Sequence, residues 1–260
     1  MDIEEEKITF EVASSSPHVH TSQPDANLRD TASPFPPSRA GDVATSGRAC
    51  TVTCEGVLAY PSAGSPTCAV LLLNPHPLLG GNMENNVIRH LWRRLAEDGA
   101  AAFRFNYRGV GGSGLVAPEG MSAYAWFNMI EAERRYEVFL PECHEALDYL
   151  RGAVGAAPLV VIGYSLGSVL AAMLAHSETV DRLVAISPPN ARISIDAFAL
   201  CAMPKLFIAG GRDMFFDAKA FDATFATLSG PKAFTAFPES DHFYRAQEEA
   251  LYEAIRRSLP

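Results

Sequence analysis

LVVIGYSLGS, residues 159–168, joins a strand-like run to a helix-like run. Its first four residues are apolar and mostly β-branched, and residues 169–175 have the composition of a helix. Between them lies Gly-x-Ser-x-Gly, the pattern of a sharp turn that lifts a serine hydroxyl, here that of Ser165, out of a sheet. Gly163 and Gly167 suit this turn because backbone packs closely on both sides of the serine. The flanking strand and helix remove most chance matches, so we interpret Ser165 as a nucleophile.

Length and composition indicate one globular α/β domain. The chain has 260 residues, of which 48% are hydrophobic and 20% charged. Its formal net charge of −9 disfavours nucleic acid or an anionic membrane as a partner, because both bind basic surfaces. The sequence contains no apolar run close to the roughly 18 residues of a membrane span. The acidic N-terminus lacks a signal or transit pattern, and the five cysteines form no CxxC pair, so we expect a cytoplasmic protein with reduced thiols.

One polar segment interrupts an otherwise regular alternation of strands and helices. Residues 1–12 contain an alternating strand at 7–12, which should pair antiparallel with a strand at 50–60. Residues 13–48 are rich in Ser, Pro, Thr, Ala and Asp without any period, which predicts a disordered insertion. Residues 49–260 should form the catalytic domain. Further strands are predicted at 69–74, 101–106, 159–164, 182–187, 205–210 and 233–237, and helices at 85–97, 136–150, 169–175, 218–228 and 244–259.

The apolar strands of this alternation predict a mostly parallel sheet with helices on both faces. In such sheets the reactive groups lie in loops beyond the carboxyl ends of the strands. The partners of Ser165 are therefore expected at the strand ends.

A serine hydroxyl needs an adjacent base that is oriented by a third group. Of the seven histidines, His242 follows the last predicted strand and lies downstream of the serine. Asp213 lies between the two, three residues beyond the strand at 205–210, whereas Asp217 has the position of a helix N-cap. The predicted nucleophile, acid and base are Ser165, Asp213 and His242.

Backbone N–H groups must also stabilise the oxyanion of a tetrahedral intermediate. The Leu166 N–H, at the start of the helix after the serine, is the first candidate. The second should come from the loop that begins Asn74-Pro75-His76-Pro77-Leu78. Proline has no N–H, which leaves His76 or Leu78. A rigid structural loop with an incidental histidine is the alternative interpretation.

The candidate substrate pocket is less defined. Leu78 and Tyr164 lie beside the predicted oxyanion loop and the serine. Tyr124, Trp126 and Phe127 lie in a long connection at 115–135 and could form a partial lid, or could simply be core. The segment from residue 187 to 203 is too short for a large cap, which favours an open pocket.

Five motifs resemble the α/β-hydrolase superfamily: Gly163-Tyr164-Ser165-Leu166-Gly167, Gly211-Arg212-Asp213, Asp241-His242-Phe243, residues 74–83 and residues 105–111. The last two resemble more narrowly its small bacterial-type hydrolases, which carry a His-Pro-His-Pro loop followed by Gly-Gly. The resemblance covers residues 50–260 and implies the α/β-hydrolase fold without a large cap domain. It also favours His76 as the second oxyanion donor, since the fold places that donor third in this loop. Asn74 departs from the pattern, which usually begins with histidine.

The sequence offers two alternative functions. Residues 109–114 match Gly-x-Gly-x-x-Gly, the fingerprint of a dinucleotide-binding oxidoreductase, but Pro118 and Gly120 disfavour the helix that must follow it. A loop near the active site is the preferred interpretation. A catalytically inactive scaffold with a hydrolase fold is the second alternative, and a complete triad argues against it.

The sequence therefore predicts a serine hydrolase that cleaves a carboxylic ester or thioester through an acyl-enzyme, with amides the weaker candidates. No metal or organic cofactor is expected. The expected partner is a small-molecule acyl substrate.

Overall fold

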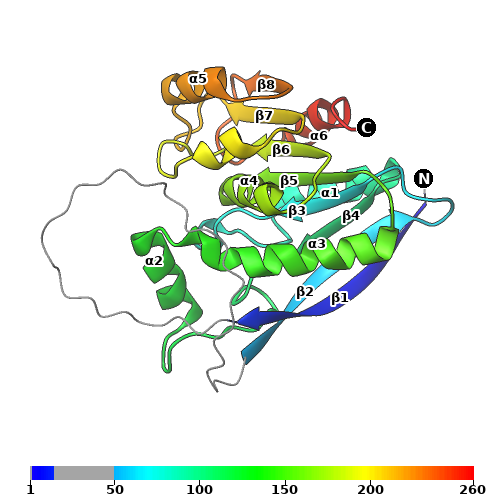
Figure 1. Ribbon diagram of the computed structural model, residues 1–260, viewed down its shortest axis with the longest axis vertical. Coiled ribbons are helices and arrows are strands. Elements are labelled where there is room, and N and C mark those ends of the chain that lie inside the picture. Colours follow the sequence, from blue (N-terminus) through cyan, green and yellow to red (C-terminus); the bar gives the residue numbers. More distant parts are fainter. Residues whose placement is uncertain (1, 15–49) are drawn as a thin grey trace, which may run out of the picture.

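Across residues 2–14 and 50–260, the part that the computed structural model describes, an eight-stranded sheet runs through the whole molecule (Figure 1). The strand order is β1-β2-β4-β3-β5-β6-β7-β8. The strands are β1 (Ile3–Ser14), β2 (Cys50–Pro61), β3 (Ala69–Leu73), β4 (Ala101–Phe105), β5 (Leu159–Tyr164), β6 (Arg182–Ile186), β7 (Lys205–Gly210) and β8 (Lys232–Phe237). β1 and β2 pair antiparallel, β2 pairs antiparallel with β4, and all other pairs are parallel.

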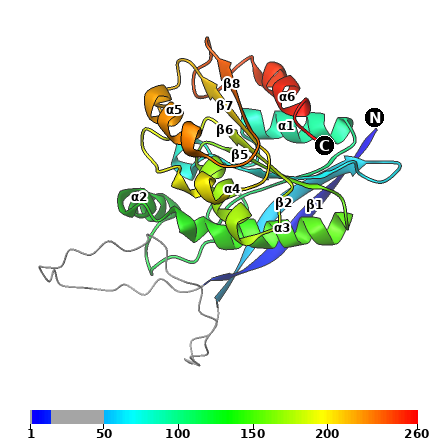
Figure 2. The ribbon, with the colours of Figure 1, turned by 45° about the horizontal axis from the view of Figure 1, so that its top comes forward.

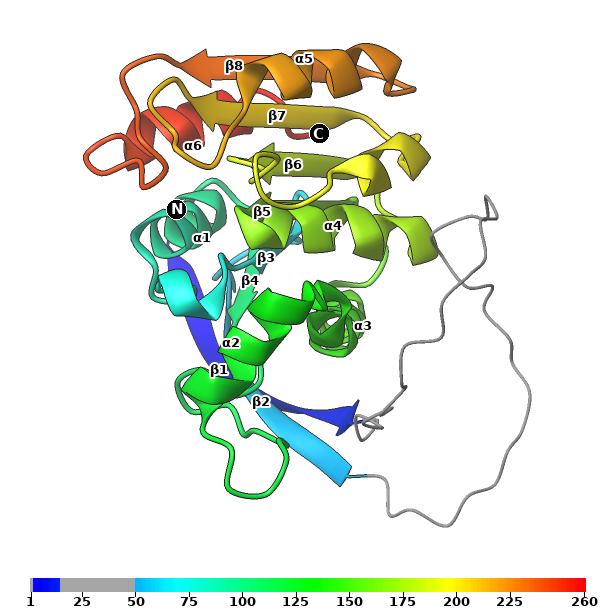
Figure 3. The ribbon, with the colours of Figure 1, turned by 90° about the vertical axis from the view of Figure 1, so that its left-hand side faces the viewer.

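Helices cover both faces of this sheet (Figures 2 and 3). They are α1 (Asn86–Glu97), α2 (Ala123–Glu133), α3 (Leu140–Val154), α4 (Leu166–Ser177), α5 (Ala218–Thr227) and α6 (Glu248–Arg256), with short 3-10 turns η1 (Pro77–Leu79), η2 (Tyr136–Phe139) and η3 (Asp196–Leu200). α1 and α6 pack into the hydrophobic core of one face, and α2, α3, α4 and α5 into that of the other. β3, β4 and β5 are buried throughout, as expected of parallel strands between two helical layers.

The predicted fold class is confirmed for the described residues: they form the mostly parallel sheet of an α/β-hydrolase fold with helices on both faces, and they include no large cap domain. The element bounds differ in places. β1 begins before residue 7 and includes residues 13 and 14, so only residues 15–48 of the predicted insertion lie outside the described residues. The predicted helix at 136–150 divides into η2 and α3, and α6 begins only at Glu248 because Tyr244 and Ala246 have positive φ.

The glycine-rich loop at 109–114 packs against β2. The Gly112 N–H donates to the Glu55 carboxylate (2.6 Å), and the Ser113 hydroxyl donates to the Asn106 carbonyl (2.9 Å). The expectation that this loop lies near the active site stays a prediction. No helix follows until α2, so the loop lacks the helix N-terminus that a dinucleotide phosphate requires.

The turn between β5 and α4 has no room for side chains at its two glycines. A Cβ on Gly163 would overlap the Gly167 carbonyl and lie 2.6 Å from the Ser168 Cα. A Cβ on Gly167 would overlap the Leu73 carbonyl at the end of β3. This close approach brings the start of α4 against the loop that follows β3.

Gly163→Ala is expected to lower the free energy of unfolding by about 3 kcal/mol, because backbone atoms must move to admit the methyl group. Urea denaturation would measure the change. Gly152→Ala is the matched control: Gly152 lies in α3 with open space around its Cβ position, and alanine there should stabilise the helix by up to about 1 kcal/mol. Equal effects of the two substitutions would contradict this account of the turn.

Within the described residues, no helix is both long and apolar enough to cross a membrane.

Candidate active site

Three strand ends bring the predicted Ser165, Asp213 and His242 together. Ser165 follows β5, Asp213 follows β7 and His242 follows β8. The Ser165 Oγ lies 3.0 Å from the His242 Nε2, and the His242 Nδ1 lies 2.8 Å from the Asp213 Oδ2. All three residues are buried, with at most 7% of any of them exposed. The side chains thus form a continuous hydrogen-bonded chain shielded from bulk water.

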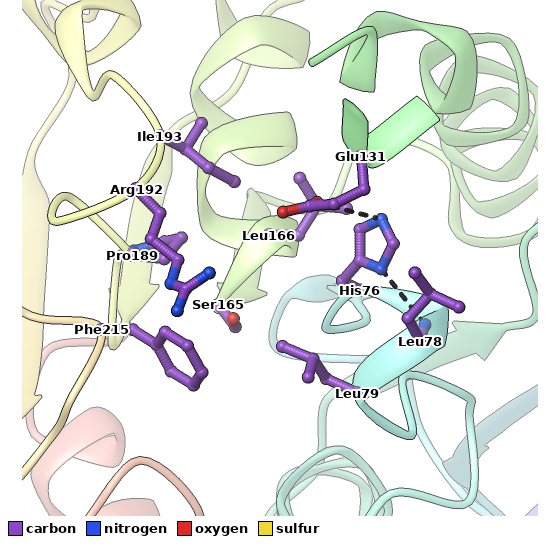
Figure 4. A pocket seen from close by; sticks show the side chains of 10 residues that line it. All are labelled: His76, Leu78, Leu79, Glu131, Ser165, Leu166, Pro189, Arg192, Ile193 and Phe215. Carbon is purple, nitrogen blue, oxygen red and sulfur yellow. Dashed lines mark hydrogen bonds and ion pairs between the residues drawn. The ribbon is translucent and has the colours of Figure 1, made fainter. Parts of the chain in front are cut away.

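The backbone at Ser165 is held in an unusual conformation. Its φ is +55°, a region that L-residues rarely occupy, and its N–H donates to the Ile186 carbonyl at the end of β6 (2.8 Å). The Ser168 hydroxyl donates to the Ser165 carbonyl (2.6 Å). These bonds fix the serine at the tip of the turn, where its hydroxyl faces the cavity in Figure 4.

Aromatic rings fix the plane of the His242 imidazole. The Phe215 ring packs edge-on against it with centroids 4.7 Å apart, and the Tyr164 ring lies on another side at 5.6 Å. The Tyr164 hydroxyl donates to the His242 carbonyl. The Asp213 Oδ1 accepts from the Phe215 N–H (2.8 Å), which leaves Oδ2 directed at the imidazole. An ionised Asp213 accepts the Nδ1 proton, so Nε2 is free to accept from the serine.

Two amides near the serine have no acceptor in the described part of the chain. They are the N–H groups of Leu166, at the first position of α4, and of His76, in the loop after β3. The Leu78 N–H is occupied, because it donates to the His76 Nδ1 (3.1 Å). Of the two donors that the sequence left open, His76 is therefore the one whose amide is free.

The His76 imidazole lines the same cavity. Burial lowers its pKa, and an Nδ1 that accepts a hydrogen bond places the proton on Nε2. That nitrogen is buried without a hydrogen-bond partner and lies 3.7 Å from the Glu131 carboxylate. Glu131 in turn accepts from the Tyr136 hydroxyl (2.9 Å). The imidazole is thus a neutral group held at the cavity wall.

A cavity of about 210 Å³ opens directly above Ser165 (Figure 4). Most of its wall is apolar, with one cation and one carboxylate at its sides. The lining residues are His76, Leu78, Leu79, Glu131, Ser165, Leu166, Pro189, Arg192, Ile193 and Phe215. The Arg192 guanidinium lies over the Phe215 ring, 5.1 Å from its centroid.

The structure brings only Leu78, among the predicted pocket residues, to this wall. Trp126 and Phe127 are buried and pack on each other, and Trp126 also packs on Phe139 in the core under α2. Tyr124 is 70% exposed and does not belong to the cavity lining. Tyr164 is buried behind His242. The expectation of an aromatic lid is therefore wrong, and the core alternative holds for Trp126 and Phe127.

The sequence did not predict that Glu131, Arg192, Ile193 and Phe215 line the cavity. The helix α2, which was not predicted, could have been recognised from the sequence. Ser122 caps it, and its buried residues Trp126, Phe127 and Ile130 have helical spacing. The predicted N-cap role of Asp217 is confirmed, because its side chain accepts from the Ala220 N–H (3.0 Å). Within the described residues, no group of three or more His, Cys, Asp or Glu side chains is arranged to hold a metal ion.

This strand order and the turn at Ser165 are those of the alpha/beta hydrolase fold. Residues 70–227 match the alpha/beta hydrolase fold family, and the chain belongs to that family. An uncharacterized protein of Rickettsia prowazekii (strain Madrid E) is 28% identical over 211 residues, which cover 77% of this chain and 82% of that protein.

Solved structures share the fold. A serine hydrolase homologue from Coxiella burnetii has a TM-score of 0.66 at 22% identity and covers 87% of this chain and all of its own. A serine hydrolase without a lid from Xanthomonas campestris has a TM-score of 0.65 at 22% identity, over 88% of this chain and 99% of its own. Est1E from Butyrivibrio proteoclasticus, with ferulic acid bound, has a TM-score of 0.64 at 16% identity, over 79% of this chain and 94% of its own. At these identities the likeness extends to the fold alone.

Proposed function

We propose that the protein is a serine hydrolase that cleaves carboxylic esters or thioesters through an acyl-enzyme. The observation that carries this proposal is the hydrogen-bonded chain from Ser165 through His242 to Asp213 at the floor of an apolar cavity. A serine hydroxyl becomes a useful nucleophile only with such a base beside it.

In the proposed mechanism, Ser165 Oγ attacks the substrate carbonyl carbon while His242 Nε2 takes the hydroxyl proton. Asp213 holds the imidazole and stabilises its cationic form. The tetrahedral intermediate collapses, and His242 protonates the departing alcohol or thiol. Water then attacks the acyl-enzyme with His242 again as base, which releases the acid and restores the serine.

The free amides of Leu166 and His76 are the proposed donors to the oxyanion. Neither amide would have to break a protein hydrogen bond in order to donate to the oxyanion. The Leu166 amide also lies at the positive end of the α4 dipole. Such preorganised donors stabilise developing charge without the reorganisation that water would need.

The cavity supports the proposed substrate class. Its mainly apolar wall suits the acyl part of an ester, and related folds include Est1E with bound ferulic acid. The narrower resemblance to small bacterial-type hydrolases and a cytoplasmic location stay predictions. An inactive scaffold is the competing proposal.

Labelling with a fluorophosphonate would decide between enzyme and scaffold. We expect one phosphonyl group per chain, located on Ser165 by peptide mass spectrometry. Ser165→Ala should abolish labelling, whereas Ser177→Ala, at the far end of α4, should retain it. An unlabelled Ser165 in folded protein would favour the scaffold.

A further inference from the structure

A second cavity of about 330 Å³ lies next to the cavity at Ser165. Its floor is apolar and its rim carries charged side chains of both signs. The lining residues are Arg134, Tyr136, Glu137, Val169, Met173, Ile193, Ser194, Asp196 and Ala197. Ile193 lines both cavities, and Figure 4 shows its side chain beside Leu166 at the edge of the first one. One partly exposed aliphatic side chain thus forms part of the boundary between the two spaces.

The floor of both cavities belongs to one face of α4. Leu166 lines the first cavity, and Val169 and Met173 line the second. These residues are three and four positions apart, so they lie in a row along the helix. From Leu166 to Met173 the helix rises about 10 Å, which is the length of an extended chain of roughly eight carbons.

A hydrogen bond also links the linings of the two cavities on the side formed by α2 and η2. Glu131 lines the first cavity and Tyr136 the second, and the Tyr136 hydroxyl donates to Glu131 (2.9 Å). This hydrogen bond holds the end of α2 to η2 where the linings of the two cavities adjoin. η3, which supplies Asp196 and Ala197, packs directly on α4 and closes the other wall. The boundary between the two cavities is therefore flanked by packed elements on both sides.

We infer that the second cavity binds the distal part of a linear, medium-length acyl chain whose carbonyl lies at Ser165. This inference rests on the proposed function and adds its substrate class. The chain would run along α4, pass Ile193 and end between Met173 and Ala197. An apolar floor without a fixed cation favours methylene groups there, while the charged rim meets solvent. Each methylene that enters the apolar space should raise kcat/KM roughly four-fold.

The test is a series of p-nitrophenyl esters from acetate to dodecanoate. The wild-type protein should show kcat/KM that rises to about octanoate and then levels off, as the space along α4 is filled. Met173→Trp fills the second cavity and should lower the octanoate-to-acetate ratio of kcat/KM by at least about ten-fold. Ile193→Trp places a bulky side chain at the boundary that the two cavities share, and it should have the same effect if Met173→Trp fails to fold.

His176→Trp is the matched control. His176 is an exposed residue of α4 that lines neither cavity, so the same bulky substitution there should leave the ratio unchanged. Hydrolysis of the acetate ester with an unchanged ratio in both folded cavity variants would overturn the inference but not the proposed function. A wild-type protein that hydrolyses the acetate ester with a higher kcat/KM than the octanoate ester would also overturn the inference and leave the proposed function intact. If no ester of the series were hydrolysed, the proposed function would fail, and the inference with it.

Discussion

Ser165→Ala is expected to lower kcat/KM for a p-nitrophenyl ester by about 10⁵- to 10⁶-fold. The alanine removes the atom that forms the acyl bond, and no other described hydroxyl lies within hydrogen-bonding distance of His242 Nε2. Residual turnover would come from the oxyanion donors and from substrate binding alone. Steady-state hydrolysis, followed at high enzyme concentration, would measure the loss.

The fold of this variant should be intact. Serine and alanine are similarly strained at φ +55°, and the backbone bonds of the turn do not involve the Ser165 hydroxyl. A melting temperature close to that of the wild type is therefore the control for the kinetic result. A folded alanine variant that keeps a tenth or more of the activity would rule out Ser165 as the nucleophile.

The sequence predicted the sheet well because its parallel strands are buried on both faces. β3, β5 and β7 are short, continuous apolar runs, and this pattern depends on little besides burial. It also placed Ser165, Asp213 and His242 at three separate strand ends. In a parallel sheet the carboxyl ends of the strands share one edge, so the residues that follow them must be neighbours.

The cavity wall could not be predicted in the same way. Glu131 and Ile193 reach the cavity from the end of α2 and from the segment before η3, and their positions depend on how these elements pack on α4. Trp126 and Phe127 illustrate the opposite error. Large aromatic side chains near a predicted site suggested a lid, but burying them against Phe139 is more favourable than leaving them at an open rim.

Asp213→Asn should lower kcat by about 10⁴-fold without unfolding the protein. The asparagine oxygen can still accept from the Phe215 N–H, but its amide group would then donate to His242 Nδ1. That bond favours the tautomer with the proton on Nε2. Such an imidazole cannot accept the Ser165 proton, so the geometry persists while the base is lost.

Asp217→Asn is the matched control for this prediction. Asp217 lies four residues further along the same loop and caps α5, a role that asparagine fills about equally well. Its kcat and melting temperature should stay close to those of the wild type. A comparable loss of kcat in the two variants would show that the charge of this loop matters in general. A loss confined to Asp213→Asn would show that the carboxylate acts through the orientation and tautomer of His242.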